Sequence, residues 1–394
     1  MSKRDVVVLS AVRSAIGSFG GGLSHLEPHE LAGTVMKEAV KRSAVDPTRI
    51  NYVTVGNCIP TDSRFAYVAR VASIQAGLPM ESVAMAVNRL CSSGLQAIVT
   101  TGQNILLGDC DYGIGGGVEV MSRGAYLSPA MRSGARMGDT MLIDSVVATL
   151  TDPFGVGHMG ITAENLAAKW NISREEQDAL AVESHRRAAA AIAEGRFKSQ
   201  IVPIVKQTRK GEVIVDTDEH VKPDTTAEAL AKMKPAFKKD GSVTAGNASG
   251  INDGAAFLVL ADAKAAEADG GKPLARLVSY AVAGVPNEFM GEGPIPATRL
   301  ALKKAGLAFN QLDVIESNEA FAAQAIAVAR ALDFDMGKVN PNGGAVALGH
   351  PIGCSGAFLA TKAIHELHRR GGRYALVTMC IGGGQGIAAI FERM

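Results

Sequence analysis

The sequence has few cysteines, and their spacing is not that of a disulfide scaffold or a structural zinc site. Its 394 residues include five cysteines, an odd number, and no two of them form a Cys-x-x-Cys motif. Disulfide scaffolds and structural zinc sites use paired or closely spaced cysteines, so we expect neither and expect a reducing compartment. The cysteines that remain to be explained are Cys58, Cys91, Cys110, Cys354 and Cys380.

The sequence also has few aromatic residues, a net charge close to zero and no long apolar run. Aromatics make up 5% of the chain, the single tryptophan is Trp170, and the formal net charge is +1. This composition lacks the basic field and the stacking surface that nucleic-acid binding uses. No apolar run reaches the ~18 residues of a membrane helix, and the first nine residues lead into a strand rather than a signal peptide. We therefore expect a cytoplasmic protein with no nucleic-acid partner and no membrane association.

Strand and helix patterns alternate along most of the chain and predict an α/β fold with helices covering a mostly parallel sheet. Strands are expected at 6–10, 52–56, 83–87, 255–260, 274–283, 374–379 and 386–391, and helices at 65–76, 174–194, 296–305, 319–332 and 355–370. The segment from Met121 to about Ala245 breaks this pattern and is interpreted as an inserted domain. Cys91-Ser-Ser-Gly resembles Cys354-Ser-Gly, and Ile114-Gly-Gly-Gly resembles Ile381-Gly-Gly-Gly, which indicates two duplicated halves.

Cys91 is the first candidate for chemistry. It follows an apolar strand and precedes small residues and an apolar helix, which predicts a strand, a sharp turn and a helix that starts at the cysteine. Unpaired N–H groups and the helix dipole at that place favour a thiolate, and Ser92, Ser93 and Gly94 leave room for a substrate carbonyl. The alternative interpretation is a buried structural cysteine, which is the commoner role.

Three further residues stand in loops poor in large side chains. His350 lies between two glycine-rich turns, where a histidine can serve as a base. Cys380 follows a strand and precedes three glycines, and Asn318 stands between a strand and a helix, where an amide can hold a water or a carbonyl. Two other features indicate no cofactor or metal: neither Gly-Gly-Gly run has the spacing of a dinucleotide fingerprint, and His365-x-x-His368 lacks zincin spacing.

Five segments then occur in the order seen in thiolases, and the chain resembles a degradative or biosynthetic thiolase over its whole length. The segments are Asn88-Arg-Leu-Cys-Ser-Ser-Gly, Gly246-Asn-Ala-Ser-Gly-Ile-Asn-Asp-Gly, Asn318-Glu-Ala-Phe-Ala, Gly349-His-Pro-Ile-Gly-Cys-Ser-Gly-Ala and Cys380-Ile-Gly-Gly-Gly-Gln-Gly. The resemblance implies a layered α-β-α-β-α fold. It also implies an N-terminal half at 1–121 and 246–270, a loop domain at 122–245 and a C-terminal half at 271–394.

The resemblance implies acyl transfer between coenzyme A and a carbon chain, by condensation of acyl-CoA or thiolytic cleavage of 3-oxoacyl-CoA. Cys91 would carry the acyl group, His350 would act as its base, and Cys380 would remove the α-proton of the incoming acyl-CoA or protonate the leaving group. Asn318, through a water, and His350 would stabilise the enolate, and the N–H groups of Cys91 and Gly382 would stabilise the acyl oxyanion.

The resemblance also places the CoA substrate, with no tightly bound cofactor and no metal. Ala248, Ser249 and Gly250 are expected to contact the pantetheine, Phe237 is expected near the adenine, and Lys222 is expected among the nucleotide contacts. The residues expected to line the acyl end are Leu150, His158, Met159, Met290 and Phe321. Lys222 stands where close relatives commonly carry arginine, and lysine loses planar, bidentate recognition of phosphate. The family implies a homotetramer made of two dimers. Other readings are a ketoacyl synthase, a non-catalytic acyl-CoA-binding relative, and a subunit of a fatty-acid oxidation complex.

Overall fold

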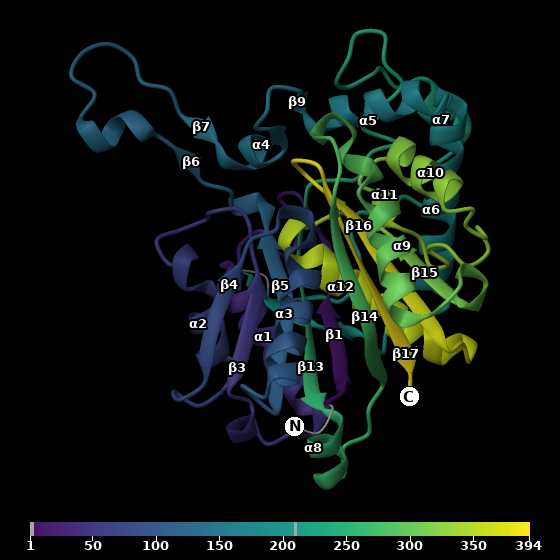
Figure 1. Cartoon of the computed structure of the whole chain (residues 1–394). Helices are drawn as coiled ribbons and strands as arrows, with labels where there is room; N and C mark the ends of the chain where they lie inside the picture. The colour runs from purple at the N-terminus through teal and green to yellow at the C-terminus, as the bar shows by residue number, and fades with distance from the viewer. Residues whose placement is uncertain (1–3, 209–210) are drawn as a thin grey trace.

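The computed structural model describes residues 4–208 and 211–394, and its largest feature is an 11-stranded sheet made from two halves (Figure 1). The N-terminal half contributes β1 (Val6–Ser14), β3 (Tyr52–Gly56), β4 (Val83–Val87), β5 (Tyr112–Val120) and β13 (Asn252–Asp262). The C-terminal half contributes β14 (Ala275–Gly284), β15 (Val314–Ser317), β16 (Tyr374–Ile381) and β17 (Gln385–Arg393). The short strands β2 (Gly17–Ser18) and β10 (Ile201–Val202) complete the sheet by pairing with β13 and β1.

The two halves repeat one topology. The N-terminal order is β1-β13-β5-β3-β4 and the C-terminal order is β14-β17-β16-β15, so the last strand of each half lies beside the first. Strand directions also correspond, since β13 and β17 run antiparallel to both neighbours, whereas β3–β5 and β15–β16 are parallel. A single parallel bridge between Ile315 and Val339 occupies the place that β4 has beside β3. The duplication expected from the sequence is therefore confirmed.

The expectation of a mostly parallel sheet is wrong. Most partners along the sheet are antiparallel, because β13 and β17 each insert between strands that run the other way. In the C-terminal half the cause is local, since β16 and β17 are joined by a tight turn with positive φ at Gly383 and Gly384, and so short a connection produces only an antiparallel pair.

Helices cover both faces of each half and form the α-β-α-β-α layers. The outer helices are α1 (Pro28–Ser43) and α2 (Val68–Gln75) on the N-terminal half and α9 (Pro294–Ala305) on the C-terminal half. Between the halves lie α3 (Ser93–Leu107) and α12 (Ile352–Arg370), and α12 contacts α3 and strands of both halves. The halves join at one edge, where Val7 and Val8 of β1 pair with Arg276 and Ala275 of β14.

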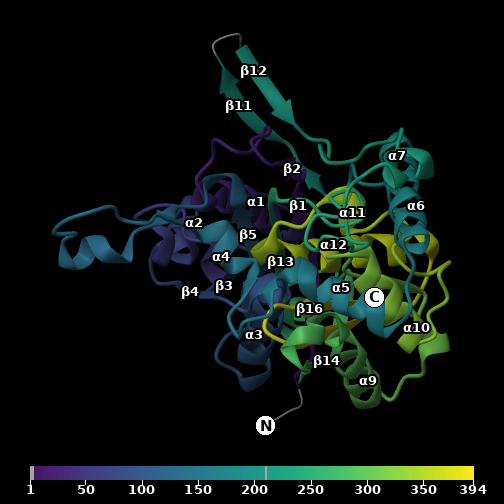
Figure 2. The ribbon, with the colours of Figure 1, turned by 90° about the horizontal axis from the view of Figure 1, so that it is seen from above.

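The segment after β5 stands partly outside these layers. It contains α4 (Ser145–Thr149), α5 (Met159–Lys169), α6 (Arg174–Ala193) and α7 (Ala227–Ala231), together with the pair β8 (Thr151–Asp152) and β9 (Gly157–His158). Two hairpins, β6 (Tyr126–Leu127) with β7 (Ile143–Asp144) and β11 (Ile204–Thr208) with β12 (Gly211–Val215), extend away from the body (Figure 2). The expected capping box at the start of α6 is present, with Ser173 and Glu176 each bonding the other's backbone N–H.

The remaining helices are α8 (Ala263–Ala268), α10 (Ala322–Ala331) and α11 (Ala345–Leu348). The helix expected from residue 319 begins only at Ala322, because Asn318–Phe321 form an irregular connection in which Ala248 bridges to Phe321. None of the helices in the part of the chain described here has the length and apolar composition to cross a membrane.

Candidate active site

Cys91 lies where β4 turns into α3, as the sequence predicts. The turn is a short 3-10 helix, Leu90–Ser92, directly before the first residue of α3. Leu90 has φ +47, which is strained for a residue with a branched side chain. Three hydrogen bonds hold it: its N–H donates to Asn88 Oδ1 (2.9 Å), and its carbonyl accepts from Ser93 Oγ (2.7 Å) and from Cys58 Sγ (3.2 Å). The backbone is thus fixed immediately before the sulfur.

Burial dominates the electrostatics of Cys91. Removal from water raises the pKa of its thiol, while hydrogen bonding by the backbone N–H groups of Gly382 and of Cys91 itself acts in the opposite direction. The expectation that the helix start favours a thiolate is therefore wrong for the net pKa, although the N–H groups do act as predicted. Cys91 is held as a thiol, and its reaction needs a base.

His350 has the geometry of a base. The Ser355 hydroxyl donates to the Pro351 carbonyl (2.8 Å), so its oxygen accepts from His350 Nδ1 at 2.6 Å. This assignment puts the ring proton on Nδ1 and leaves Nε2 unprotonated, so its lone pair can accept a proton. Burial lowers the pKa of His350 to about 4, so the ring is neutral at pH 7. The loop is held as well, because the His350 N–H donates to Asn252 Oδ1 at 3.1 Å.

Asn318 and Cys380 complete the group from two neighbouring strands of the C-terminal half. Asn318 follows β15, and its Nδ2 lies 3.5 Å from His350 Nε2. Its Oδ1 is buried without a partner among the described residues. Cys380, in β16, is fully buried, and burial and the nearby Cys91 raise the pKa of its thiol well above the usual range. A thiol of this kind stays protonated at neutral pH and yields a strong base when it is deprotonated.

A small cavity of about 40 Å³ opens at Cys91. Eight of the residues expected at the site line it: Cys91, Leu150, Met159, Ser249, Met290, Phe321, His350 and Gly382. Leu90, Thr149, Ala320 and Ile352 line it too, and the sequence argument had not named them. Its walls are mostly apolar, which suits a short acyl chain.

Other expected residues lie around this cavity or away from it. Cys380 packs with Met159, Met290 and Phe321 in one cluster, and Ala248 belongs to the same cluster. His158 and Phe237 stack on each other with ring centroids 4.7 Å apart. Gly250 packs close to His220. Lys222 is exposed on a loop, and its backbone N–H donates to His185 Nδ1 at 3.1 Å. Neither Gly250 nor Lys222 lines the cavity.

Two residues that the sequence argument missed support the site. Ser355 fixes the His350 ring and stands in the first turn of α12, five residues after the histidine. Glu119, in β5, is fully buried and accepts hydrogen bonds from the N–H groups of Cys58, Ile59 and Gly353 at 2.9 to 3.1 Å. It thereby ties the end of β3 to the start of α12, and burial raises its pKa to about 7.

Comparison with known proteins gives one consistent result. The thiolase N-terminal domain model matches residues 6–264, and the thiolase C-terminal domain model matches residues 271–393. The chain belongs to the thiolase family. It is 58% identical to the β-ketothiolase BktB of Cupriavidus necator over 99% of this chain and 100% of that protein. It is 49% identical to an acetyl-CoA acetyltransferase of Chromobacterium violaceum, again over 99% and 100%.

Solved thiolases have the same fold. The crystal structure of human mitochondrial 3-ketoacyl-CoA thiolase in complex with CoA matches with a TM-score of 0.96 and 44% identity, over 99% of this chain and 98% of that one. This thiolase is an acyltransferase that works on CoA thioesters, and the non-catalytic alternative is not favoured. Among the residues that the structure describes, no group of three or more His, Cys, Asp or Glu side chains is arranged to hold a metal.

Proposed function

We propose that this thiolase cleaves and forms short-chain 3-oxoacyl-CoA through an acyl group carried on Cys91. The observation that supports a short chain is the cavity of about 40 Å³ beside the sulfur, which has room for a few carbon atoms. Leu90, Met159 and Met290 are among the apolar side chains that close it.

In the cleavage direction, we assign the first proton transfer to His350. Its unprotonated Nε2 takes the Cys91 proton, and the sulfur attacks the 3-oxo carbon of the substrate. The oxyanion that forms would lie against the N–H groups of Cys91 and Gly382, the same groups that act to lower the pKa of the thiol. The carbon–carbon bond then breaks, leaving an acyl-Cys91 thioester and the enolate of acetyl-CoA.

Cys380 would protonate that enolate on carbon, and its raised pKa keeps it protonated for this role. Asn318 and His350 would stabilise the enolate oxygen, and the unpartnered Asn318 Oδ1 leaves this amide free to bind a water. Free CoA then gives its thiol proton to the Cys380 thiolate and attacks the acyl-Cys91 thioester. Cys91 leaves as a thiolate and takes back the proton held by His350, which regenerates both thiols and the neutral histidine. Condensation is the reverse sequence, in which the Cys380 thiolate removes the α-proton.

The CoA chain would approach between the segment after β5 and the C-terminal half. We assign pantetheine contacts to Ala248, Ser249 and Gly250, and stacking contacts along the chain to His158 and Phe237. Leu150 and Phe321 would border the acyl end, and Lys222 would meet a phosphate as a point charge. CoA is a substrate in this scheme, with no tightly bound cofactor. The domain division at 1–121 with 246–270, 122–245 and 271–394 assigns CoA binding and subunit contacts to the middle segment.

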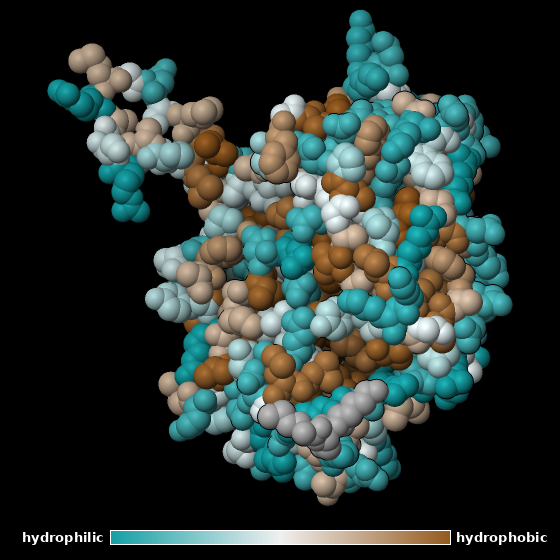
Figure 3. All heavy atoms as spheres, viewed as in Figure 1, coloured by the Kyte–Doolittle hydropathy of each residue, from teal (hydrophilic) through white to brown (hydrophobic). Residues whose placement is uncertain are grey.

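The proposed assembly is a homotetramer in the cytoplasm. The hairpin of β6 and β7 stands off the body as an arm (Figure 3), and Tyr126, Met131 and Met137 on it are 63%, 60% and 97% exposed. Large apolar side chains on a projecting arm favour contact with another subunit. Light scattering would test this, with the prediction that deleting residues 128–141 reduces a tetramer to dimers.

Thiolysis of 3-oxoacyl-CoA thioesters of increasing chain length tests the substrate proposal. The reaction rate is measured as the loss of the enolate absorbance of the substrate. We expect activity to peak at acetoacetyl-CoA and to fall as the acyl chain outgrows the cavity. Equal activity on long chains would contradict the short-chain assignment, and enlarging the cavity with Met290→Ala should shift the preference toward longer chains.

A further inference from the structure

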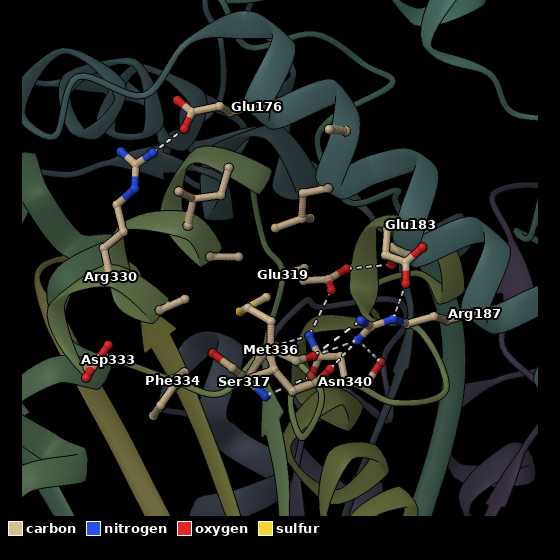
Figure 4. Close-up of a pocket in the computed structure, with 17 residues that line it drawn as sticks. Glu176, Glu183, Arg187, Ser317, Glu319, Arg330, Asp333, Phe334, Met336 and Asn340 are labelled. Carbon is tan, nitrogen blue, oxygen red and sulfur yellow. Dashed lines mark hydrogen bonds and ion pairs between the residues drawn. The ribbon is translucent and has the colours of Figure 1, made fainter.

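A second cavity, much larger than the one at Cys91, lies behind the Asn318 connection. Its volume is about 500 Å³, within the range of small-molecule sites. It opens between α6 and α10 and extends inward to the end of β15 (Figure 4). Leu180, Ala325, Ile326 and Phe334 give it an apolar wall, and the inner end is formed by Ser317, Glu319 and Asn340. None of these residues lines the Cys91 cavity.

The charges around this cavity disfavour an anion. Arg330 pairs with Glu176, and Arg187 pairs with Glu183 at 2.6 Å, so both rim arginines already have carboxylate partners. Arg187 also donates to the Val339 carbonyl at 2.6 Å. Glu319 and Asp333 add two more carboxyl groups to the lining. A carboxylate or phosphate ligand would meet excess negative charge, so CoA and free fatty acids do not fit.

One hydroxyl at the inner end has no hydrogen-bond partner in the described part of the chain. Ser317 is 3% exposed, lines the cavity, and its Oγ makes no hydrogen bond within the described residues. In Figure 4 its side chain points away from Asn340 toward the Phe334 side of the open space. Buried hydroxyl groups are normally hydrogen-bonded, and an unmet one is unfavourable. A ligand oxygen that reaches Ser317 would supply the missing partner.

We propose that this cavity is an effector site for an uncharged, mostly apolar small molecule that carries one hydrogen-bonding oxygen, such as an alcohol or a ketone. Its apolar body would lie against α6 and α10, and its oxygen would bond to Ser317 Oγ. The ion pairs Arg330–Glu176 and Arg187–Glu183 at the rim would stay formed when the ligand binds.

The site is placed to influence Asn318, because Ser317 and Glu319 flank that residue in the chain. Asn340 clamps the segment, with Nδ2 donating to the Ser317 carbonyl and to Glu319 Oε1, both at 2.8 Å. The backbone N–H of Asn318 donates to the Thr378 carbonyl at 3.0 Å, whereas the one hydrogen bond of its side-chain amide within the described residues is the long 3.5 Å contact with His350. A ligand on Ser317 therefore acts next to a catalytic side chain that has a single long hydrogen bond, and we expect turnover to change while CoA binding does not.

The test uses hexan-1-ol and hexanoate as probes of equal chain length, with saturation-transfer NMR on the full-length protein at neutral pH. We expect hexan-1-ol to bind at least about tenfold more tightly than hexanoate. Ala179→Phe fills the mouth of the cavity from α6, and Ala193→Phe is the matched control, because Ala193 is exposed on the same helix but outside the cavity. Hexan-1-ol should lose at least about tenfold in affinity in the first variant and keep its affinity in the second.

Activity measurements complete the test and separate this site from the Cys91 cavity. Saturating hexan-1-ol should change kcat for thiolysis at least about twofold in the unsubstituted protein and in Ala193→Phe, with KM for CoA unchanged, and should have no such effect in Ala179→Phe. Tighter binding of hexanoate, or equal binding of hexan-1-ol to both variants, would overturn the ligand assignment. Binding that Ala179→Phe abolishes but that leaves kcat unaffected would overturn the effector role.

Discussion

Replacing Ser355 by alanine tests whether this serine fixes the tautomer of the base His350. In this variant His350 Nδ1–H loses its acceptor in a buried site, and the ring gains freedom to carry its proton on Nε2, where it cannot accept the Cys91 proton. An unsatisfied buried donor costs about 1–3 kcal/mol. If that loss falls on the reactive tautomer, Cys91 acylation slows about 5- to 150-fold. The assay is single-turnover labelling of the protein by radiolabelled acetyl-CoA.

Thr361→Val is the matched control for this prediction. Thr361 is buried in the same helix, and its hydroxyl donates to the Ala357 carbonyl four residues earlier, just as Ser355 donates to Pro351. It makes no contact with His350, so we expect acylation at the rate of the unsubstituted protein. Ser355→Ala acylating at that rate too would refute the argument that this serine selects the tautomer, whereas equal slowing in both variants would show a general effect of helix α12.

Three further predictions concern buried groups. Cys380→Ala should still form the labelled acyl-enzyme from acetyl-CoA, because CoA can leave as a thiolate, but should lose condensation by about 10²-fold or more, because no Cys380 thiolate remains to remove the α-proton; an unlabelled variant would contradict the assignment. Burial raises the Glu119 pKa from its usual value to about 7, so the carboxyl holds its proton more tightly folded than unfolded. Since Glu119→Gln removes this group alone, the free energy of unfolding of the unsubstituted protein minus that of the variant should fall by about 3 kcal/mol as pH rises from about 4.5 to 7 and then level off, as urea titrations of both proteins at each pH would show. Lys362→Met should destabilise the fold by about 3–5 kcal/mol, because it strands the fully buried Glu316 carboxyl that Lys362 holds at 2.8 Å; a loss below about 1 kcal/mol in urea unfolding would show that the pair matters little.

The features that sequence reasoning found are those encoded locally. The turn at Cys91 follows from an apolar strand, three small residues and an apolar helix, and all of these lie within about a dozen positions. The start of α6 follows from Ser173 and Glu176, three residues apart. The repeated glycine and cysteine motifs indicated the duplication, and the matching strand orders confirm it.

The features that it missed depend on contacts between distant segments. Strand direction was wrong because β13 reaches its place beside β1 only after more than 200 residues of chain, and no local pattern specifies that pairing. The direction of the Cys91 pKa was wrong because burial depends on several segments packing over one sulfur. Glu119 was missed because its donors come from β3 and α12, far from it in sequence.

The most direct test of the central claim is the position of the acyl group. The protein is mixed with acetoacetyl-CoA in the absence of free CoA, quenched in acid, digested and examined by mass spectrometry. The account predicts one added acetyl group on the peptide that contains Cys91, its removal when CoA is added, and its absence from Cys91→Ala, which should otherwise fold and melt like the unsubstituted protein. An acetyl group on Cys380 or Cys58 instead, or turnover that continues in Cys91→Ala, would contradict the account.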